Sequence, residues 1–143
     1  MSTTIFNQVA SNRETTSTER VPVWKHGVAV AVVAAIATTA LAAIAKGAGV
    51  SFADSTGAAI PTLGFTELTI VFSLIGTGIA AVMARRAGRP RTTFVRTAVA
   101  LTVLSYVPDL ISGFSAGSAA TLIALHTIAA VIVVPVLARR LAL

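Results

Sequence analysis

Four long runs of apolar residues, separated by short polar segments, dominate the sequence. They cover residues 23–45, 65–84, 93–111 and 119–138, and about 20 apolar residues suffice for a helix to cross the hydrocarbon core of a bilayer. The pattern therefore predicts an all-α, four-helix transmembrane bundle over residues 22–143. A polar, Ser/Thr-rich tail over residues 1–21 precedes it.

The longest predicted loop, residues 46–64, contains glycines, Asp54 and Pro61 together with a few apolar side chains. This mixture allows the loop to lie on the membrane surface or to fold back over the mouth of the bundle. An arginine-rich turn joins the second and third runs, and a Ser/Gly turn over residues 112–118 joins the third and fourth.

The composition of the chain agrees with this interpretation. Of its 143 residues, 55% are hydrophobic and 11% are charged, whereas an ordinary soluble domain carries about 25% charged residues. Too few polar side chains are available to cover a water-facing surface. The composition excludes a soluble enzyme and a disordered chain, and it predicts a multi-pass protein of the cell membrane whose immediate partner is the lipid bilayer.

The charge distribution predicts the topology. The chain has 11 basic and 5 acidic residues, an excess that in a soluble protein would indicate nucleic-acid binding. Here the basic residues flank the apolar runs, so no nucleic-acid partner is predicted. All but Lys46 fall on one side of the predicted spans, which places both termini in the cytoplasm (N-in/C-in) by the positive-inside rule. These ten are Arg13, Arg20, Lys25, Arg85, Arg86, Arg89, Arg91, Arg96, Arg139 and Arg140.

Cysteine and histidine usage excludes several cofactors. The chain has no cysteine, which excludes a thiol–disulfide enzyme, a thiolate metal site and c-type haem attachment. A bis-histidine haem would need both His26 and His126, which lie near opposite faces of the predicted bundle. The spacing of the remaining histidine and carboxylates matches no metal-ligand pattern, so we predict neither a metal nor a cofactor.

Small residues recur every fourth position along the first apolar run. Such a ridge of small side chains lets a second helix approach closely, and together with the short loops it favours packing within the bundle or assembly of the protein with itself. The ridge consists of Gly27, Ala31, Ala35, Thr39, Ala43 and Gly47.

Three ionisable residues inside the apolar runs are candidate catalytic residues: Glu67, Asp109 and His126. From the predicted span ends, the two carboxylates lie about 3–5 Å and the imidazole about 10 Å below the outer interface. Ionisable groups at membrane depth indicate a functional site by default. We therefore expect an outward-facing polar cavity bounded by these three side chains. Its candidate ligand-binding residues are Lys46, Ser73, Ser105 and Tyr106.

Each of these residues also has a structural interpretation. Glu67 follows Thr66 near a helix start, where a carboxylate interacts favourably with the helix dipole. Asp109 lies at a helix C-terminal end, where the dipole disfavours it, and pairing with Lys46 or His126 would relieve that conflict. His126 alone is typical of a hydrogen bond between helices, and each hydroxyl can bond back to its own helix.

The segment Tyr106-Val107-Pro108-Asp109-Leu110, followed by a Ser/Gly turn and Thr121-Leu122-Ile123-Ala124-Leu125-His126, resembles a family of small four-helix integral membrane proteins. That family is widespread in actinobacteria and has no assigned function. The resemblance implies four spans and one site that contains Asp109 and His126. It implies no activity.

Three classes of function stay open at this point. The first is a small membrane protein that binds a lipophilic ligand or assembles with itself or with partners. The second is a membrane-embedded acid–base enzyme for an isoprenoid-like substrate, in which Asp109 or Glu67 donates a proton that His126 tunes or accepts; the scarcity of aromatic residues argues against it. The third is a proton-coupled exporter working as a dimer, for which Glu67 is predicted to be too shallow.

Overall fold

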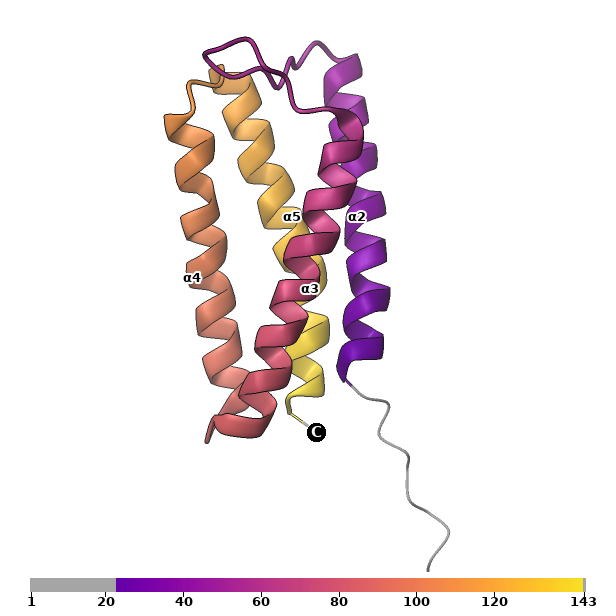
Figure 1. The fold of residues 1–143 in the computed structure, drawn as a ribbon, viewed down its shortest axis with the longest axis vertical. Coiled ribbons are helices and arrows are strands. Elements are labelled where there is room, and N and C mark those ends of the chain that lie inside the picture. Colours follow the sequence, from indigo (N-terminus) through magenta and orange to yellow (C-terminus); the bar gives the residue numbers. More distant parts are fainter. Residues whose placement is uncertain (1–22, 143) are drawn as a thin grey trace, which may run out of the picture.

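The computed structural model describes residues 23–142, which form four long helices in an up-down-up-down bundle (Figure 1). The helices are α2 (Val23–Gly47), α3 (Thr62–Arg86), α4 (Pro90–Ile111) and α5 (Ala116–Arg140). Each is long and apolar enough to cross a membrane, so the predicted fold class is confirmed. The predicted polar tail lies outside the described residues.

Three of the helices begin three residues before the start that the apolar pattern predicts. The reason is local: Pro61 immediately precedes α3, Pro90 is the first residue of α4, and the Ser115 hydroxyl accepts the backbone N–H of Ser118 at the start of α5. Proline suits the first helical position because its missing N–H would have no partner there. The connecting loop is therefore residues 48–61, and the Ser/Gly turn is residues 112–115.

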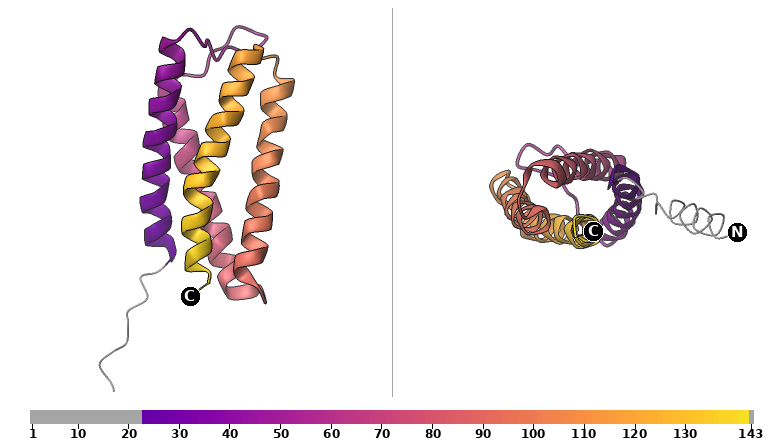
Figure 2. Two further views of the ribbon diagram at one scale, coloured as in Figure 1. Left: turned by 180° about the vertical axis from the view of Figure 1, so that it is seen from behind. Right: turned by 90° about the horizontal axis from the view of Figure 1, so that it is seen from below.

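Charge divides the bundle into two ends. We call the end with the start of α2, the α3–α4 turn and the end of α5 the basic end, and the end with residues 48–61 and 112–115 the loop end (Figures 1 and 2). Lys46 closes α2 at the loop end. The arrangement follows the predicted charge distribution, and which end faces the cytoplasm stays a prediction. Lys25, Arg85, Arg86, Arg89, Arg91, Arg96, Arg139 and Arg140 belong to the basic end.

The predicted ridge of small residues is only half correct. Its members up to Ala35 are buried, whereas Ala43 and Gly47 are exposed. Each step of four residues overshoots a helical turn by about 40°, so a strict four-residue ridge rotates away from the neighbouring helix. The buried face of α2 continues instead through Thr38 and Ala42.

Two apolar clusters hold the helices together. The basic-half core draws on all four helices: Val30, Ala34, Ala80, Phe94, Val133, Leu137 and Ala138. The loop-half core draws on α2, α3, α5 and the connecting loop: Ala42, Phe52, Phe65, Leu122 and Leu125. Because α4 contributes nothing to the second cluster, apolar packing holds α4 to the bundle in the basic half only.

The loop over residues 48–61 lies across the loop end (Figure 2). The side chain of Phe52 is inserted between the helices, is 1% exposed, and meets the ring of Phe65 edge-on with centroids 5.0 Å apart. At the other side of the mouth, the backbone N–H of Ser55 donates to the carbonyl oxygen of Ser112 at 3.3 Å. The loop therefore folds back over the bundle and reaches the α4–α5 turn.

Candidate functional site

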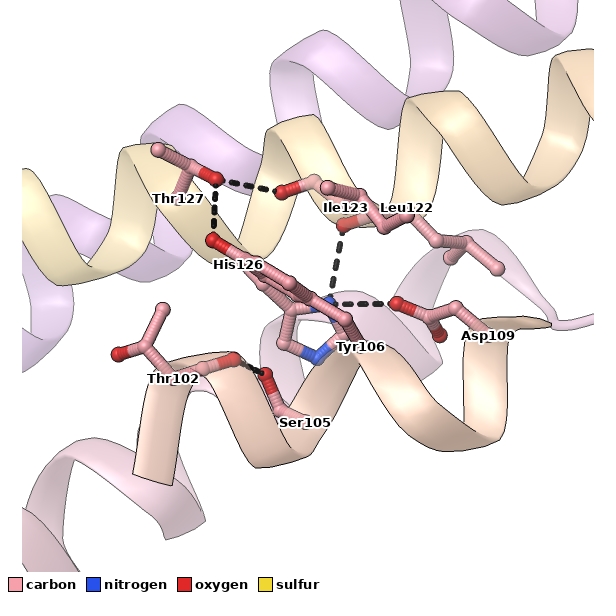
Figure 3. A network of polar contacts seen from close by, with 8 residues as sticks. All are labelled: Thr102, Ser105, Tyr106, Asp109, Leu122, Ile123, His126 and Thr127. Atoms are coloured by element: carbon pink, nitrogen blue, oxygen red, sulfur yellow. Dashed lines mark hydrogen bonds and ion pairs between the residues drawn. The ribbon is translucent and has the colours of Figure 1, made fainter. Parts of the chain in front are cut away.

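In the loop half of α4, the polar side chains share one face of the helix. Thr102, Ser105, Tyr106 and Asp109 follow the i, i+3, i+4, i+7 spacing of a single helical stripe, and Figure 3 shows this stripe beside α5. In the loop half, where α4 takes no part in the apolar core, this seam supplies the polar contacts between α4 and α5.

The centre of the seam is a close polar contact between Asp109 and His126. Nδ1 of His126 lies 3.1 Å from Oδ2 of Asp109 and 2.9 Å from the carbonyl oxygen of Leu122 (Figure 3). A carbonyl oxygen only accepts, so Nδ1 carries the hydrogen and donates it to Leu122. The Nε2 atom of the neutral ring is then a hydrogen-bond acceptor.

Burial separates the two partners of this pair. The side chain of Asp109 is 8% exposed, whereas that of His126 is 40% exposed. Oδ2 of Asp109 is buried and has no hydrogen-bond partner in the part of the chain that the structure describes, because Nδ1–H is directed to Leu122. Asp109 thus places a carboxyl group behind the ring, and His126 provides the surface that a ligand can touch.

Tyr106 forms a second contact across the seam. Its hydroxyl lies 2.8 Å from Oγ1 of Thr127, whose own hydrogen is donated to the carbonyl oxygen of Ile123, so Tyr106 is the donor. Ser105 behaves differently, since its hydroxyl donates back to the carbonyl oxygen of Thr102 at 2.7 Å. Of these two predicted ligand-binding residues, Tyr106 joins α4 to α5, whereas the Ser105 hydroxyl forms its hydrogen bond within α4.

Glu67 lies elsewhere. It is exposed on α3, and it forms no ion pair or hydrogen bond within residues 23–142. The same residues contain no group of three His, Asp or Glu side chains that could hold a metal ion, so Glu67 is not assembled with the Asp109–His126 pair. The capping interpretation is also wrong, because α3 begins at Thr62 and the hydroxyl of Thr66 instead meets that of Thr39 at 2.7 Å.

Two hydrogen bonds between helices fix the depth of Glu67. Thr66 pairs with Thr39, and Thr69 pairs with Thr38 at 3.0 Å, so Glu67 is level with these threonines of α2. Thr39 precedes Lys46 by seven residues, which corresponds to about 10 Å along the helix. Glu67 therefore lies farther from the loop end of the bundle than the 3–5 Å expected from its position in the apolar run, because α3 starts earlier than predicted.

Ser73 and Lys46 are also separate from the seam. Ser73 is buried on α3, and its carbonyl oxygen accepts the hydroxyl of Thr77, a residue that packs against Gly27 of α2. Lys46 is exposed in the last turn of α2. The structure brings Asp109, His126, Ser105 and Tyr106 together and leaves the other three candidates in different places.

Toward the loop end, α3 and α4 move apart (Figure 1). In α4, Phe94 is 2% exposed, but Leu101, seven residues later on the same face, is 46% exposed. In α3, Ile79 packs against the basic-half core, but Phe72, seven residues earlier on the same face, is 64% exposed. The sequence carried no signal for these two flanking residues, because apolar side chains that face lipid and those that face the core look alike.

His126 is only partly covered in this half of the bundle. It lies on the face of α5 that buries Leu122 and Val133, and yet two fifths of its side chain is exposed. Two hollows at the basic end, of about 430 and 170 Å³, are lined by other residues and include none of the seven candidates.

Four candidate membrane-spanning helices with a polar seam between the last two define the class: a small four-helix membrane protein. A family model described as "Family of unknown function (DUF6069)" matches residues 18–143, and the chain belongs to this family. No curated protein and no solved structure matches the chain. The family assignment confirms the expectation of a family without assigned function, and any activity has to be argued from the site.

Proposed function

We propose that this protein binds a lipophilic molecule whose head group donates a hydrogen bond to Nε2 of His126. The observation that carries the proposal is the exposure of His126: its imidazole lies on the buried face of α5 and is nevertheless 40% exposed. Nε2 is the acceptor atom of the ring, because Nδ1 donates to Leu122.

Asp109 acts as a positioning residue in this proposal. Its carboxylate, 3.1 Å from Nδ1, favours the tautomer with hydrogen on Nδ1 and makes Nε2 a better acceptor, as carboxylates behind ligating histidines do. When the Asp109 carboxyl group is ionised, its charge also selects the ligand. A hydroxyl or an ammonium group is attracted to this site, whereas a phosphate or carboxylate head group is repelled.

The apolar part of the ligand lies between the diverging halves of α3 and α4. Phe72 and Leu101 are exposed on the two faces that converge in the basic half. In a bilayer, both side chains adjoin lipid, so a lipophilic molecule reaches His126 from the membrane without crossing water.

Mass spectrometry of the purified protein tests this proposal directly. We expect a lipophilic alcohol or amine to co-purify with the wild type and to be lost from His126→Leu, which removes the acceptor, and from Leu101→Trp, which places a bulkier side chain on the exposed face of α4. Thr121→Val is the matched control on α5, because the Thr121 hydroxyl donates only to Gly117 of its own helix. Retention of the molecule by both site variants contradicts the proposal. Chemical conversion of the bound molecule would support the acid–base enzyme considered above.

A second candidate function is self-assembly, which the position of Glu67 favours. Its carboxyl group is exposed about 10 Å from the level of Lys46, and Val71 and Leu74 on the same face of α3 are exposed as well. Lipid tails offer no hydrogen bond to a carboxyl group. A second copy, related by a two-fold axis along the membrane normal, brings its own Glu67 to the same depth, where two carboxyl groups share one proton.

The absence of cysteine makes this candidate easy to test. Assembly through α3 predicts that Leu74→Cys forms a disulfide-linked dimer on mild oxidation in membranes. Ser73→Cys, one residue away on the buried face, serves as the control and stays monomeric. Glu67→Leu weakens the Leu74→Cys cross-link, whereas Glu67→Gln preserves it because an amide hydrogen-bonds to its copy. Equal cross-linking at positions 73 and 74 argues against a specific α3 interface.

A further inference from the structure

A hollow of about 430 Å³ at the basic end is lined by three arginines and two apolar residues. Arg91 comes from the first turn of α4, and Arg139 and Arg140 come from the last turn of α5. Val136 and Ala142 complete the wall. Guanidinium groups and apolar side chains are therefore combined in one concave surface where two spans end.

The positive charge of this hollow has no carboxylate to balance it in the part of the chain that the structure describes. The three acidic residues there are Asp54 in the loop-end loop, Glu67 in the loop half of α3, and Asp109, which pairs with His126. Three like charges around one small space repel each other, and an anion bound among them removes that repulsion.

We propose that this hollow binds the phosphate head group of an anionic membrane lipid. Arginine suits this role because its planar guanidinium group binds phosphate oxygens through two parallel hydrogen bonds. Val136 and Ala142 contact the apolar part of the lipid next to its head group. The hollow lies where the spans end, which is the head-group level of a membrane. The site uses none of the residues of the proposed ligand site at His126.

A general topology signal and a specific lipid site predict different losses of lipid binding when individual arginines are replaced. The positive-inside rule treats all basic residues of this end alike, and a diffuse surface potential contributes about 1 kcal/mol per basic residue wherever it lies. A specific site depends on Arg91 and Arg139 far more than on Arg86 and Arg89, which do not line the hollow.

Lipid titration of the purified full-length protein tests the site, with native mass spectrometry as the readout. The probes are phosphatidylglycerol, phosphatidylcholine and inorganic phosphate. We expect wild type to prefer phosphatidylglycerol, and the double variant R91Q/R139Q to lose at least about tenfold more affinity than the control R86Q/R89Q, which removes the same charge. Val136→Trp keeps every charge but fills the hollow, and it is expected to lose the lipid as well. Gel filtration of each variant confirms that it is folded.

Equal losses in the two double variants would overturn the site in favour of a diffuse basic surface. Unchanged binding by Val136→Trp would also overturn it, since the hollow itself would then be unnecessary. If inorganic phosphate displaces phosphatidylglycerol at equal concentration, the site is one for free anions and the lipid proposal is wrong.

Discussion

Asp109 and His126 meet at 3.1 Å across the α4–α5 interface, in the half of the bundle where α4 contributes no residue to the apolar core. The basic half of α4 is anchored by Phe94, but no residue of its loop half belongs to either apolar core. The pair therefore has two roles in the structure. It positions the imidazole for a ligand, and it holds the loop half of α4 to α5.

Substitution of His126 is expected to destabilise the protein more than substitution of both partners. His126→Leu places an apolar side chain against the buried carboxyl group of Asp109, whose Oδ2 has no other polar partner among the described residues, and loss of this polar contact is expected to cost about 1–3 kcal/mol. In Asp109→Leu/His126→Leu, both polar groups are replaced by apolar ones, so much of this loss is recovered. Unfolding of the three proteins in mixed detergent micelles measures the difference.

Tyr106→Phe serves as the reference for the loss of stability in this comparison. It removes only the hydrogen bond to Thr127, and interhelical hydrogen bonds in membranes contribute about 0.6 kcal/mol, with a maximum near 1.7. A His126→Leu variant no less stable than Tyr106→Phe would show that the Asp109 carboxylate is not stranded, and the structural role of the pair would then be wrong.

The sequence located Asp109, His126 and Glu67 by the same signal, an ionisable group in an apolar run, but the structure assembles only the first two. Depth along a helix follows from counting residues. Rotation around the helix is harder to predict, because many side chains facing lipid and many facing the core are both apolar. In α3, a stripe of small polar residues does mark the side that faces α2, and Glu67 lies off that stripe; the stripe consists of Thr66, Thr69, Ser73 and Thr77.

The packing between helices also separates features that the sequence predicts from features that it does not. The four spans, their order and the charge at their ends were all predictable from hydropathy and from the basic residues. The register of α2 against α3 could not be predicted from the sequence. It depends on hydrogen-bonded pairs such as Thr39–Thr66, and a threonine in one helix does not indicate which residue of another helix it will contact. The burial of Phe52 also depends on the loop path, and the sequence allowed two paths.

At Gly27, α2 packs against Thr77 of α3 with no room for a Cβ atom. A Cβ atom at Gly27 would overlap Cγ2 and Oγ1 of Thr77 and would lie 2.8 Å from its Cβ. Gly27→Ala therefore has to push the helices apart, at a cost of about 1–3 kcal/mol. Thermal unfolding in detergent measures this loss. Gly76→Ala is the control, because a Cβ there has no neighbour within 4 Å, and it is expected to be neutral or stabilising. Similar losses at the two glycines would contradict close packing at Gly27.

Phe52 closes the loop half of the bundle from the loop side. Its backbone has a positive φ of 52°, a conformation that costs a residue with a side chain about 1–2 kcal/mol, and burial of the ring against Phe65 offsets this cost. We expect Phe52→Ala to lose about 3–5 kcal/mol, because the strain stays and the buried ring is gone. Faster hydrogen exchange of the Ile60 amide, which donates to the Phe52 carbonyl oxygen, reports the loosened loop. In Phe52→Leu, the leucine side chain refills part of the space, so the Ile60 amide should exchange more slowly than in Phe52→Ala. Unchanged exchange in Phe52→Ala would mean that the ring does not hold the loop.

Asp54 organises the outer part of the same loop and makes it sensitive to acid. The hydrogen bond from the Thr56 hydroxyl, followed by that from the Thr56 backbone N–H, lowers the pKa of Asp54 below its ordinary value. A carboxyl group with a lowered folded-state pKa stabilises the fold above its unfolded-state pKa, and this stabilisation is lost as the pH falls through the folded-state pKa. The protection of Thr56 and Ala58 against hydrogen exchange, relative to the intrinsic rate at each pH, should therefore fall below about pH 4, because their N–H groups donate to the Asp54 carboxylate. Asp54→Asn keeps an acceptor oxygen but does not titrate in this range, so its exchange should show no such acid step. The same acid step in Asp54→Asn would assign the titration to another group.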